Sequence, residues 1–446
     1  MFRRSFLKSL AVAPVAGLVR PRPLDAALPK AKITKVNIYE PPNVNRLFNQ
    51  SNMLITVETD IGITGIGEGG AKDTLEQCAG NLIGQNPFQI ERLWREMYDS
   101  WFYPPGREKI HAQGAMDLAL WDIKGKALNT PIHQILGGSL RDYCECYATG
   151  NVRPGGAAGG GRGGQGGARG GQGAGGAGGQ GGARGGQPQG DPAVRIRESA
   201  AATIAYGYRV YRMDAGGITP VTGNVYNSRE RVRLVADACK AAKEGLGRHG
   251  DFMIDFHQRF DFSDALRCCK AIEEYEPYLV EDPVRDEHAL QDIPKLRQMT
   301  VCPLAHGEEW GQRWDFNKLV ENHDIDYVRC TVPNVGGITE MMKIAAMCET
   351  HAVGIVPHFT GPVSTAALVH CLSTFSGPVL FEFNYADRVI EYLPEFLDFR
   401  KGRLYTNDRP GIGVTLDVKP LKLISTVTQV GRRQFYQRPD GSVNHW

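Results

Sequence analysis

A chain of 446 residues is long for one domain and is typical of two, one of them large enough for a barrel of roughly 200–250 residues. With 51 Lys and Arg against 49 Asp and Glu, the formal net charge of +2 excludes the strongly basic field of a nucleic-acid-binding or membrane-surface protein. Because no strong field is present, we expect a small-molecule partner. The ten cysteines show no CxxC pair and no zinc-finger spacing, so we assign no disulfide.

The N-terminus resembles an export signal. Arg3 and Arg4 precede a short apolar run from Ser9 to Val19, as in a twin-arginine signal, which predicts a leader over residues 1–28 and a periplasmic protein. The alternative is a basic N-terminus without signal function on a cytoplasmic protein. No segment approaches the roughly 18 consecutive apolar residues of a membrane span, so we expect no stable membrane insertion.

Residues 33–140 predict a small α+β domain. Two segments, Phe88–Tyr103 and Lys109–Leu128, carry apolar residues at three- and four-residue spacing, which is typical of amphipathic helices packed together. The preceding segments alternate polar and apolar residues in the manner of antiparallel strands. These predicted strands are Ile33–Tyr39, Met53–Glu58 and Ile63–Glu68.

Between residues 143 and 413, short apolar strands alternate with amphipathic helices, the pattern of a parallel sheet with crossover helices. The predicted strands are Glu145–Thr149, Tyr208–Met213, Phe252–Asp255, Tyr278–Glu281, Pro303–Glu308, Tyr327–Cys330, Gly354–His358 and Val379–Phe383. Eight strands in this order favour an α/β fold of the (β/α)8, TIM-barrel type over an open sheet.

A low-complexity segment interrupts the barrel after its first strand. Residues 155–190 are almost entirely Gly, Ala, Gln and Arg and cannot bury enough apolar surface to offset their ordering entropy, which predicts a disordered loop. Arg162, Arg169 and Arg184 make an RGG-type nucleic-acid segment the alternative. The absence of aromatic residues and the predicted export argue against it, so we expect no nucleic-acid partner.

Three acidic residues end predicted strands three, four and five: Asp255, Glu281 and Glu308. Each is separated from the next by about one strand–helix unit, so the three carboxylates follow one another around the rim where barrel enzymes build their sites. Singly, such an acid is more often a helix cap or a solvated charge. Three converging oxygen ligands favour a hard divalent cation such as Mg²⁺.

The chain from Ile33 to Trp446 resembles the enolase superfamily in its mandelate racemase and muconate lactonizing branch. The resemblance rests on the phrase from Ala115 to Lys126, on Leu136-Gly137-Gly138, on the three acidic strand ends, and on Gly336-Gly337-Ile338-Thr339. It implies an N-terminal α+β capping domain that residues 414–446 complete, and one Mg²⁺ per subunit. We also expect a homo-oligomer.

Within that branch, His257 after the first acid and His358 at the end of strand seven resemble the acid-sugar dehydratases of galactonate and mannonate type. The resemblance implies Mg²⁺-dependent dehydration of an aldonate-type sugar acid to a 2-keto-3-deoxy acid through an enediolate. His257 is then the acid that expels the 3-hydroxyl group, because histidine gives and takes protons near neutral pH.

Two candidates for the base stay open. His358 is one, although in the galactonate-type enzymes this histidine pairs with an Asp on strand six, where this chain has Thr331. The mannonate-type enzymes use an Arg on strand two with a Tyr in the following loop. Arg212 matches that Arg, and Tyr226 takes the Tyr role if its loop folds inward. Asp214 is the next candidate on that face.

Two more residues are expected to bind substrate. Arg329 lies where the mannonate-type enzymes carry an Arg on strand six, and Glu382 lies where the family places an acid that hydrogen-bonds substrate. The alternative for Glu382 is an ion pair with Arg329. The match is partial, since Pro362 occupies the position of an acid in the mannonate-type enzymes.

Two rival functions remain from the sequence. The strand-two motif around Arg212 lacks the Lys-x-Lys of racemases and cycloisomerases, which argues against a two-sided Lys/His exchange but leaves a carboxylate epimerase as one rival. The other is a binding protein that retains metal and carboxylate recognition but has lost its base.

Overall fold

The computed structural model describes residues 28–42, 53–100, 103, 105–147, 191–215, 227–386, 389–431 and 435–444. The predicted leader up to residue 27, the Gly-rich insert and Tyr226 lie outside these residues, so their assignments stay predictions, as does the homo-oligomer. Among the described helices, none has the length and apolar character needed to cross a membrane.

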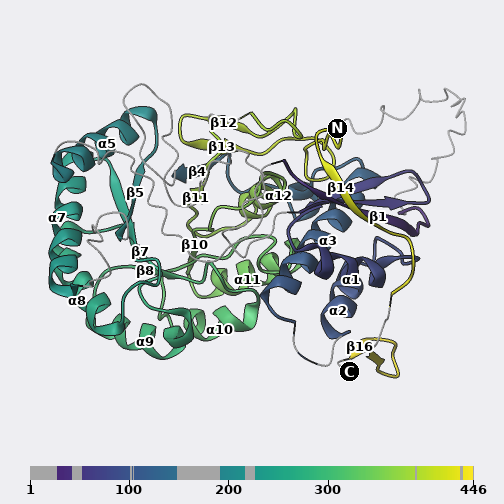
Figure 1. The fold of residues 1–446 in the computed structure, drawn as a ribbon, viewed down its shortest axis with the longest axis horizontal. Helices are drawn as coiled ribbons and strands as arrows, with labels where there is room; N and C mark the ends of the chain where they lie inside the picture. Colours follow the sequence, from purple (N-terminus) through teal and green to yellow (C-terminus); the bar gives the residue numbers. More distant parts are fainter. Residues whose placement is uncertain are drawn as a thin grey trace, which may run out of the picture.

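The capping domain is a four-stranded antiparallel sheet covered by helices (Figure 1). Its strands run in the order β14-β1-β2-β3, so a strand from the C-terminal part of the chain pairs with the first one. Their bounds are β1 Ile33–Glu40, β2 Leu54–Thr59, β3 Thr64–Glu68 and β14 Lys422–Val427. The helices are α1 Lys72–Leu82, α2 Ile90–Asp99 and α3 Arg107–Ala127, with the short α4 Ile132–Ile135 after them.

Helix α3 lies directly on β3 because β3 is rich in glycine. A Cβ on Gly67 would lie 2.0 Å from the carbonyl oxygen of Ala115, and one on Gly65 would lie 2.1 Å from that of Ala119. Only glycine permits this approach. The close packing buries most of α3 between the sheet and the second domain.

In the described residues the second domain contains eight parallel strands, each followed by a helix except for the last. The strands are β4 Cys144–Tyr147, β5 Val210–Asp214, β6 Asp251–Asp255, β7 Leu279–Glu281, β8 Leu304–His306, β9 Tyr327–Val328, β10 Gly354–Ile355 and β11 Phe381–Glu382. The helices are α5 Pro192–Tyr206, α7 Ser228–Leu246, α8 Phe262–Ile272, α9 Ala289–Met299, α10 Arg313–Glu321, α11 Ile338–Thr350 and α12 Pro362–Ser373. Short 3₁₀ turns occupy Glu273–Tyr275 and Asp286–His288.

The strands form the wall of a barrel, with the helices around the outside (Figure 1). Strands β5 to β10 pair in sequence, the bridge from Ile355 to Val379 leads to β11, and β11 pairs with β4. In the described residues no ladder joins β4 to β5. One buried layer takes residues from β4 to β8 and from positions next to β10 and β11: Tyr147, Val210, Met253, Leu279, Ala305, Val356 and Leu380. Such a layer fills the interior of a barrel.

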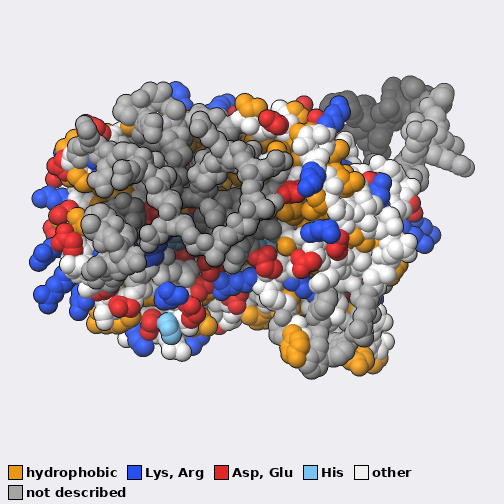
Figure 2. Space-filling view, viewed as in Figure 1, with side chains coloured by type: hydrophobic (Ala, Val, Ile, Leu, Met, Phe, Trp, Pro, Cys, Tyr) orange, Lys and Arg blue, Asp and Glu red, His pale blue; other side chains and the backbone are white. Residues whose placement is uncertain are grey.

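The described residues after β11 also form two β-hairpins. Strands β12 Asp398–Arg400 and β13 Arg403–Tyr405 add to β4 in antiparallel fashion, and β15 Tyr436–Gln437 pairs with β16 Val443–Asn444. The second hairpin lies beside α2, where Arg92 donates to the carbonyl of Gly441 at 3.3 Å. Figure 2 shows positive and negative side chains interspersed on the visible face, as expected from the near-neutral net charge.

Four barrel strands of the described residues, β8 to β11, end earlier than the sequence predicts. The fifth was expected to reach Glu308 but ends at His306, because Gly307 adopts a left-handed conformation with φ of 103°. The seventh ends at Ile355, before His358. Glu308 and His358 therefore lie in the loops just beyond their strands, with side-chain directions that strand alternation does not give.

Candidate active site

Three buried carboxylates lie at the carboxyl ends of neighbouring strands. Asp255 and Glu281 are the last residues of β6 and β7 and face each other in register, and Glu308 follows two residues after β8. Asp255 and Glu281 are fully buried and Glu308 is 7% exposed. The residues predicted as metal ligands thus share one rim of the barrel.

Two arginines, Arg329 fully buried and Arg212 11% exposed at its side chain, contact these carboxylates. Arg212 on β5 hydrogen-bonds Asp255, and its Nε lies 3.9 Å from Glu281 Oε2. Arg329, just after β9, places Nη2 at 2.5 Å from Glu281 Oε1 and 3.9 Å from Glu308 Oε2. Arg212 therefore bridges Asp255 and Glu281, Arg329 bridges Glu281 and Glu308, and the two guanidinium groups partly neutralise the acids.

Burial and the mutual repulsion of the acids raise their pKa values. Burial, together with the neighbouring carboxylates, raises the pKa of Asp255 and of Glu308 well above the usual range. Burial also raises the pKa of Glu281, against the lowering effect of Arg329 and Arg212. Neither oxygen of Glu281 accepts a hydrogen bond within the described residues. A divalent cation would supply positive charge and take these oxygens as its ligands, so the residues fit one.

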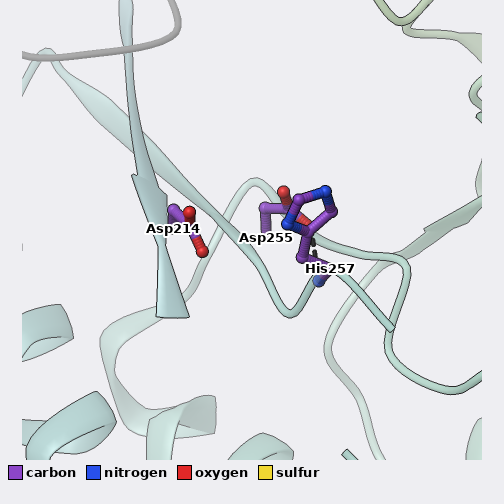
Figure 3. Close-up of side chains that lie close together, drawn as sticks. All are labelled: Asp214, Asp255 and His257. Atoms are coloured by element: carbon purple, nitrogen blue, oxygen red, sulfur yellow. Dashed lines mark hydrogen bonds between the residues drawn. The ribbon is translucent and has the colours of Figure 1, made fainter. Parts of the chain in front are cut away.

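A second group of potential metal ligands shares Asp255. The ligand atoms of Asp214, Asp255 and His257 all lie within 4.8 Å of one another (Figure 3). Asp214 ends β5 and pairs directly with Asp255 across the sheet. The sequence analysis named Asp214 only as the next candidate for the base. Its position at the end of strand two could have indicated that it lies on this rim.

His257 presents a protonated nitrogen toward the rim. It follows β6 in a left-handed conformation with φ of 52°, and its backbone N–H donates to Asp255 Oδ1 at 2.6 Å. Arg259 Nη2 lies 3.1 Å from Nδ1 of the ring, and a guanidinium only donates, so Nδ1 accepts. The proton of the neutral ring is therefore on Nε2, which lies 3.7 Å from Glu308 Oε1. Burial lowers the pKa of His257.

His358 presents the opposite ring state to the same carboxylate. Its Nδ1 lies 2.6 Å from the carbonyl oxygen of Phe359, and a carbonyl only accepts, so Nδ1 carries the proton. Nε2 is then an unprotonated acceptor, 3.6 Å from Glu308 Oε2. Burial lowers the pKa of His358 to about 4. Thr331 occupies the position at which an Asp partner for His358 was sought. The Phe359 carbonyl, which accepts from Nδ1, orients the ring instead.

Glu382 is held by three donors. Its Oε2 accepts from Arg329 Nη2, from the Tyr147 hydroxyl and from the Phe359 backbone N–H, each at 3.0 Å. Burial by itself would raise the pKa of Glu382, but Arg329, with His358 and Arg212, lowers it to about 2. The alternative ion pair with Arg329 is therefore present. Sequence reasoning placed Tyr147 in strand one but missed its hydroxyl.

Replacing Arg329 by Met should destabilise the protein by about 3–5 kcal/mol, because removing one partner leaves buried charge uncompensated. The guanidinium is fully buried and contacts Glu281 and Glu382. Urea unfolding measures the loss, with Arg197→Met as control, since the Arg197–Glu244 pair is 45% and 44% exposed and such pairs contribute about 1 kcal/mol or less. Equal losses in the two variants would contradict this role for Arg329.

Comparison with known proteins identifies relatives of both domains. Residues 33–137 match the N-terminal domain of mandelate racemase/muconate lactonizing enzyme, and residues 195–420 match the enolase C-terminal domain-like family. The chain is 30% identical over 432 residues to the D-galactonate dehydratase of Pectobacterium atrosepticum, which covers 93% of this chain and 100% of that protein. It is also 30% identical to the D-galactonate dehydratase of Xanthomonas oryzae pv. oryzae, covering 88% of this chain and 96% of that protein.

Solved structures agree with the fold. A member of the enolase superfamily from Salmonella Typhimurium has a TM-score of 0.74 at 23% identity, covering 89% of this chain and 99% of that one. A mandelate racemase/muconate lactonizing enzyme from Sulfitobacter sp. has a TM-score of 0.71 at 22% identity, covering 87% and 93%. The expected barrel with its α+β cap is thereby confirmed.

Proposed function

We propose that this chain, which belongs to the mandelate racemase/muconate lactonizing enzyme family of the enolase superfamily, is a hydro-lyase that converts an aldonate-type sugar acid to a 2-keto-3-deoxy acid. The near full-length similarity to two D-galactonate dehydratases supports the reaction class.

The observation that carries this proposal is the pair of histidines. His257 and His358 come from opposite sides of the rim and turn their Nε2 atoms to the two oxygens of one carboxylate, Glu308, at 3.7 and 3.6 Å. One Nε2 carries a proton and the other has a free electron pair. Dehydration next to a carboxylate needs both, one group to take the α-proton and one to protonate the departing hydroxyl.

Asp255, Glu281 and Glu308 would hold the metal, which we propose to be Mg²⁺ because all three offer oxygen ligands. A divalent cation bound there stabilises the negative charge that builds up on the substrate carboxylate when its neighbouring proton is removed. Asp214 and His257 are the alternative residues that could bind a metal together with Asp255. The arginines Arg212 and Arg329 are placed to attract an anionic substrate to the same rim.

The acid role of His257 sets a condition on its neighbour. A general acid must be the imidazolium, with protons on both ring nitrogens, whereas Nδ1 now accepts from Arg259. Arg259 is exposed, so its side chain is free to leave the ring when substrate binds. Proton donation then proceeds from Nε2 on the substrate side.

For the base, the ring state of His358 supports that residue. Its Nε2 is unprotonated, and the imidazolium formed by proton abstraction keeps its Nδ1–H on the Phe359 carbonyl. Arg212, which would assist Tyr226, already forms an ion pair with Asp255. We retain Tyr226 as the alternative base.

The test is turnover of a panel of aldonic and aldaric acids with Mg²⁺ in deuterated solvent. The proposal expects a 2-keto acid product and loss of water. Deuterium entering recovered substrate without any dehydration would indicate an epimerase, and binding without exchange or product would indicate a protein that has lost its base.

A further inference from the structure

A chain of alternating charges lies directly behind the three acidic strand ends. It begins in the capping domain at Arg107, the first residue of α3, which reaches across to the barrel. Its Nη2 lies 2.7 Å from Asp286 Oδ2 and its Nη1 lies 2.9 Å from Glu309 Oε2. Glu309 directly follows Glu308, so one cap residue contacts the loops after β7 and β8 together.

From Asp286 the chain continues into the barrel interior. Asp286 Oδ1 lies 3.0 Å from His306 Nε2, and His306 Nδ1 lies 3.1 Å from Asp282 Oδ1. His306 and Asp282 are fully buried, and Asp286 is only 9% exposed at its side chain. With a carboxylate at each ring nitrogen, His306 serves as a cation between two anions.

Asp282 ties this chain to the backbone of the rim. It directly follows Glu281 and adopts a left-handed conformation, with φ of 41°. Its Oδ1 accepts from the backbone N–H of Gly307, which directly precedes Glu308, at 3.1 Å. The loops that carry two of the acids are therefore joined at a single carboxylate.

The loop after β6 joins the same network through Gln258. Its side chain donates to Asp282 Oδ2 at 3.4 Å and accepts from the Asp286 backbone N–H at 3.1 Å. Its own N–H donates to the Asp282 carbonyl at 3.0 Å. Gln258 follows Asp255 by one short turn, so all three acid-bearing loops meet in one network that ends at Arg107.

We propose that Arg107 is a positioning residue through which the docked cap raises the affinity of the rim for a divalent cation. This inference rests on the proposed function insofar as Asp255, Glu281 and Glu308 hold the metal. Groups behind metal ligands fix the directions of those ligands, and their loss commonly weakens metal binding by about 10–100-fold. Arg107 itself touches none of the three acids.

The test is titration of the full-length protein with Mn²⁺, followed by electron paramagnetic resonance of the free ion. Arg107→Met should raise the Kd for Mn²⁺ by about tenfold. Asp286→Asn should do the same, because it removes the charge that faces both Arg107 and His306. Arg107→Lys should give an intermediate Kd, since it keeps the charge but not the two-armed contact.

Arg197→Met is the matched control, because Arg197 is 45% exposed against 48% for Arg107 and pairs with Glu244 away from the rim. Its Kd should equal that of the wild type. Raising Mg²⁺ to saturation should restore most of kcat in Arg107→Met, because the three acids remain.

An unchanged Kd in Arg107→Met would overturn the inference whatever the result for Asp286→Asn, as would equal shifts in Arg107→Met and Arg197→Met. These results would leave sugar-acid dehydration standing. Failure of the proposed function has a different signature, a wild-type protein that binds Mn²⁺ but turns over no sugar acid, and the comparison of Kd values still decides the role of Arg107.

Discussion

Glu281→Gln is expected to lower sugar-acid turnover by about a thousandfold or more while the protein stays folded. The change removes one of three negative charges from the rim, and charge stabilisation by a bound cation contributes several kcal/mol, about 4 kcal/mol for a thousandfold change in rate. The fold should survive, because Gln has the same shape and Arg329 keeps Glu382 at 3.0 Å. The measurements are kcat at saturating Mg²⁺ and the melting temperature.

Glu287→Gln is the control for this prediction. Glu287 lies in the same loop after β7, is 62% exposed and forms an ion pair with the exposed Arg285. Its turnover should match the wild type. Full turnover of Glu281→Gln, or wild-type turnover in excess chelator, would contradict a metal site built on Glu281.

His257→Asn is expected to abolish water loss while the α-proton of the substrate still exchanges with deuterated solvent. Expelling hydroxide without an acid is the harder half of the reaction, whereas the base on the other side is intact. Asn is the suitable replacement, because residue 257 has φ of 52° and Asn tolerates this left-handed conformation. Proton exchange is followed by NMR and product by absorbance of a 2-keto acid derivative.

The same assay distinguishes the two candidate bases. If His358 is the base, His358→Asn should remove both exchange and dehydration, and Tyr226→Phe should weaken them less. The reverse order would assign the base to Tyr226 with Arg212. Undiminished exchange in both variants would exclude both and direct attention to Asp214, the acid paired with Asp255 across β5 and β6.

The arrangement of elements follows from the sequence because periodicity and order are local properties. The cap is predicted by the alternation in β1 to β3 and by the three- and four-residue spacing in α2 and α3. The barrel is predicted by the regular succession of strands and helices. The placement of Asp255, Glu281 and Glu308 on one rim followed from the same order, since parallel neighbouring strands end at one edge.

What the sequence by itself determined is therefore the fold and the rim on which the acids, histidines and arginines lie. Only the tertiary structure decided their chemical states, because these depend on how each ring is turned relative to nearby donors and acceptors, which spacing in the chain does not give. The Phe359 carbonyl fixes the proton on His358 and Arg259 fixes that on His257, and no spacing in the chain predicts which ring nitrogen faces Glu308. Likewise Arg107 and Asp286 are far apart in the sequence and meet only when the cap docks on the barrel.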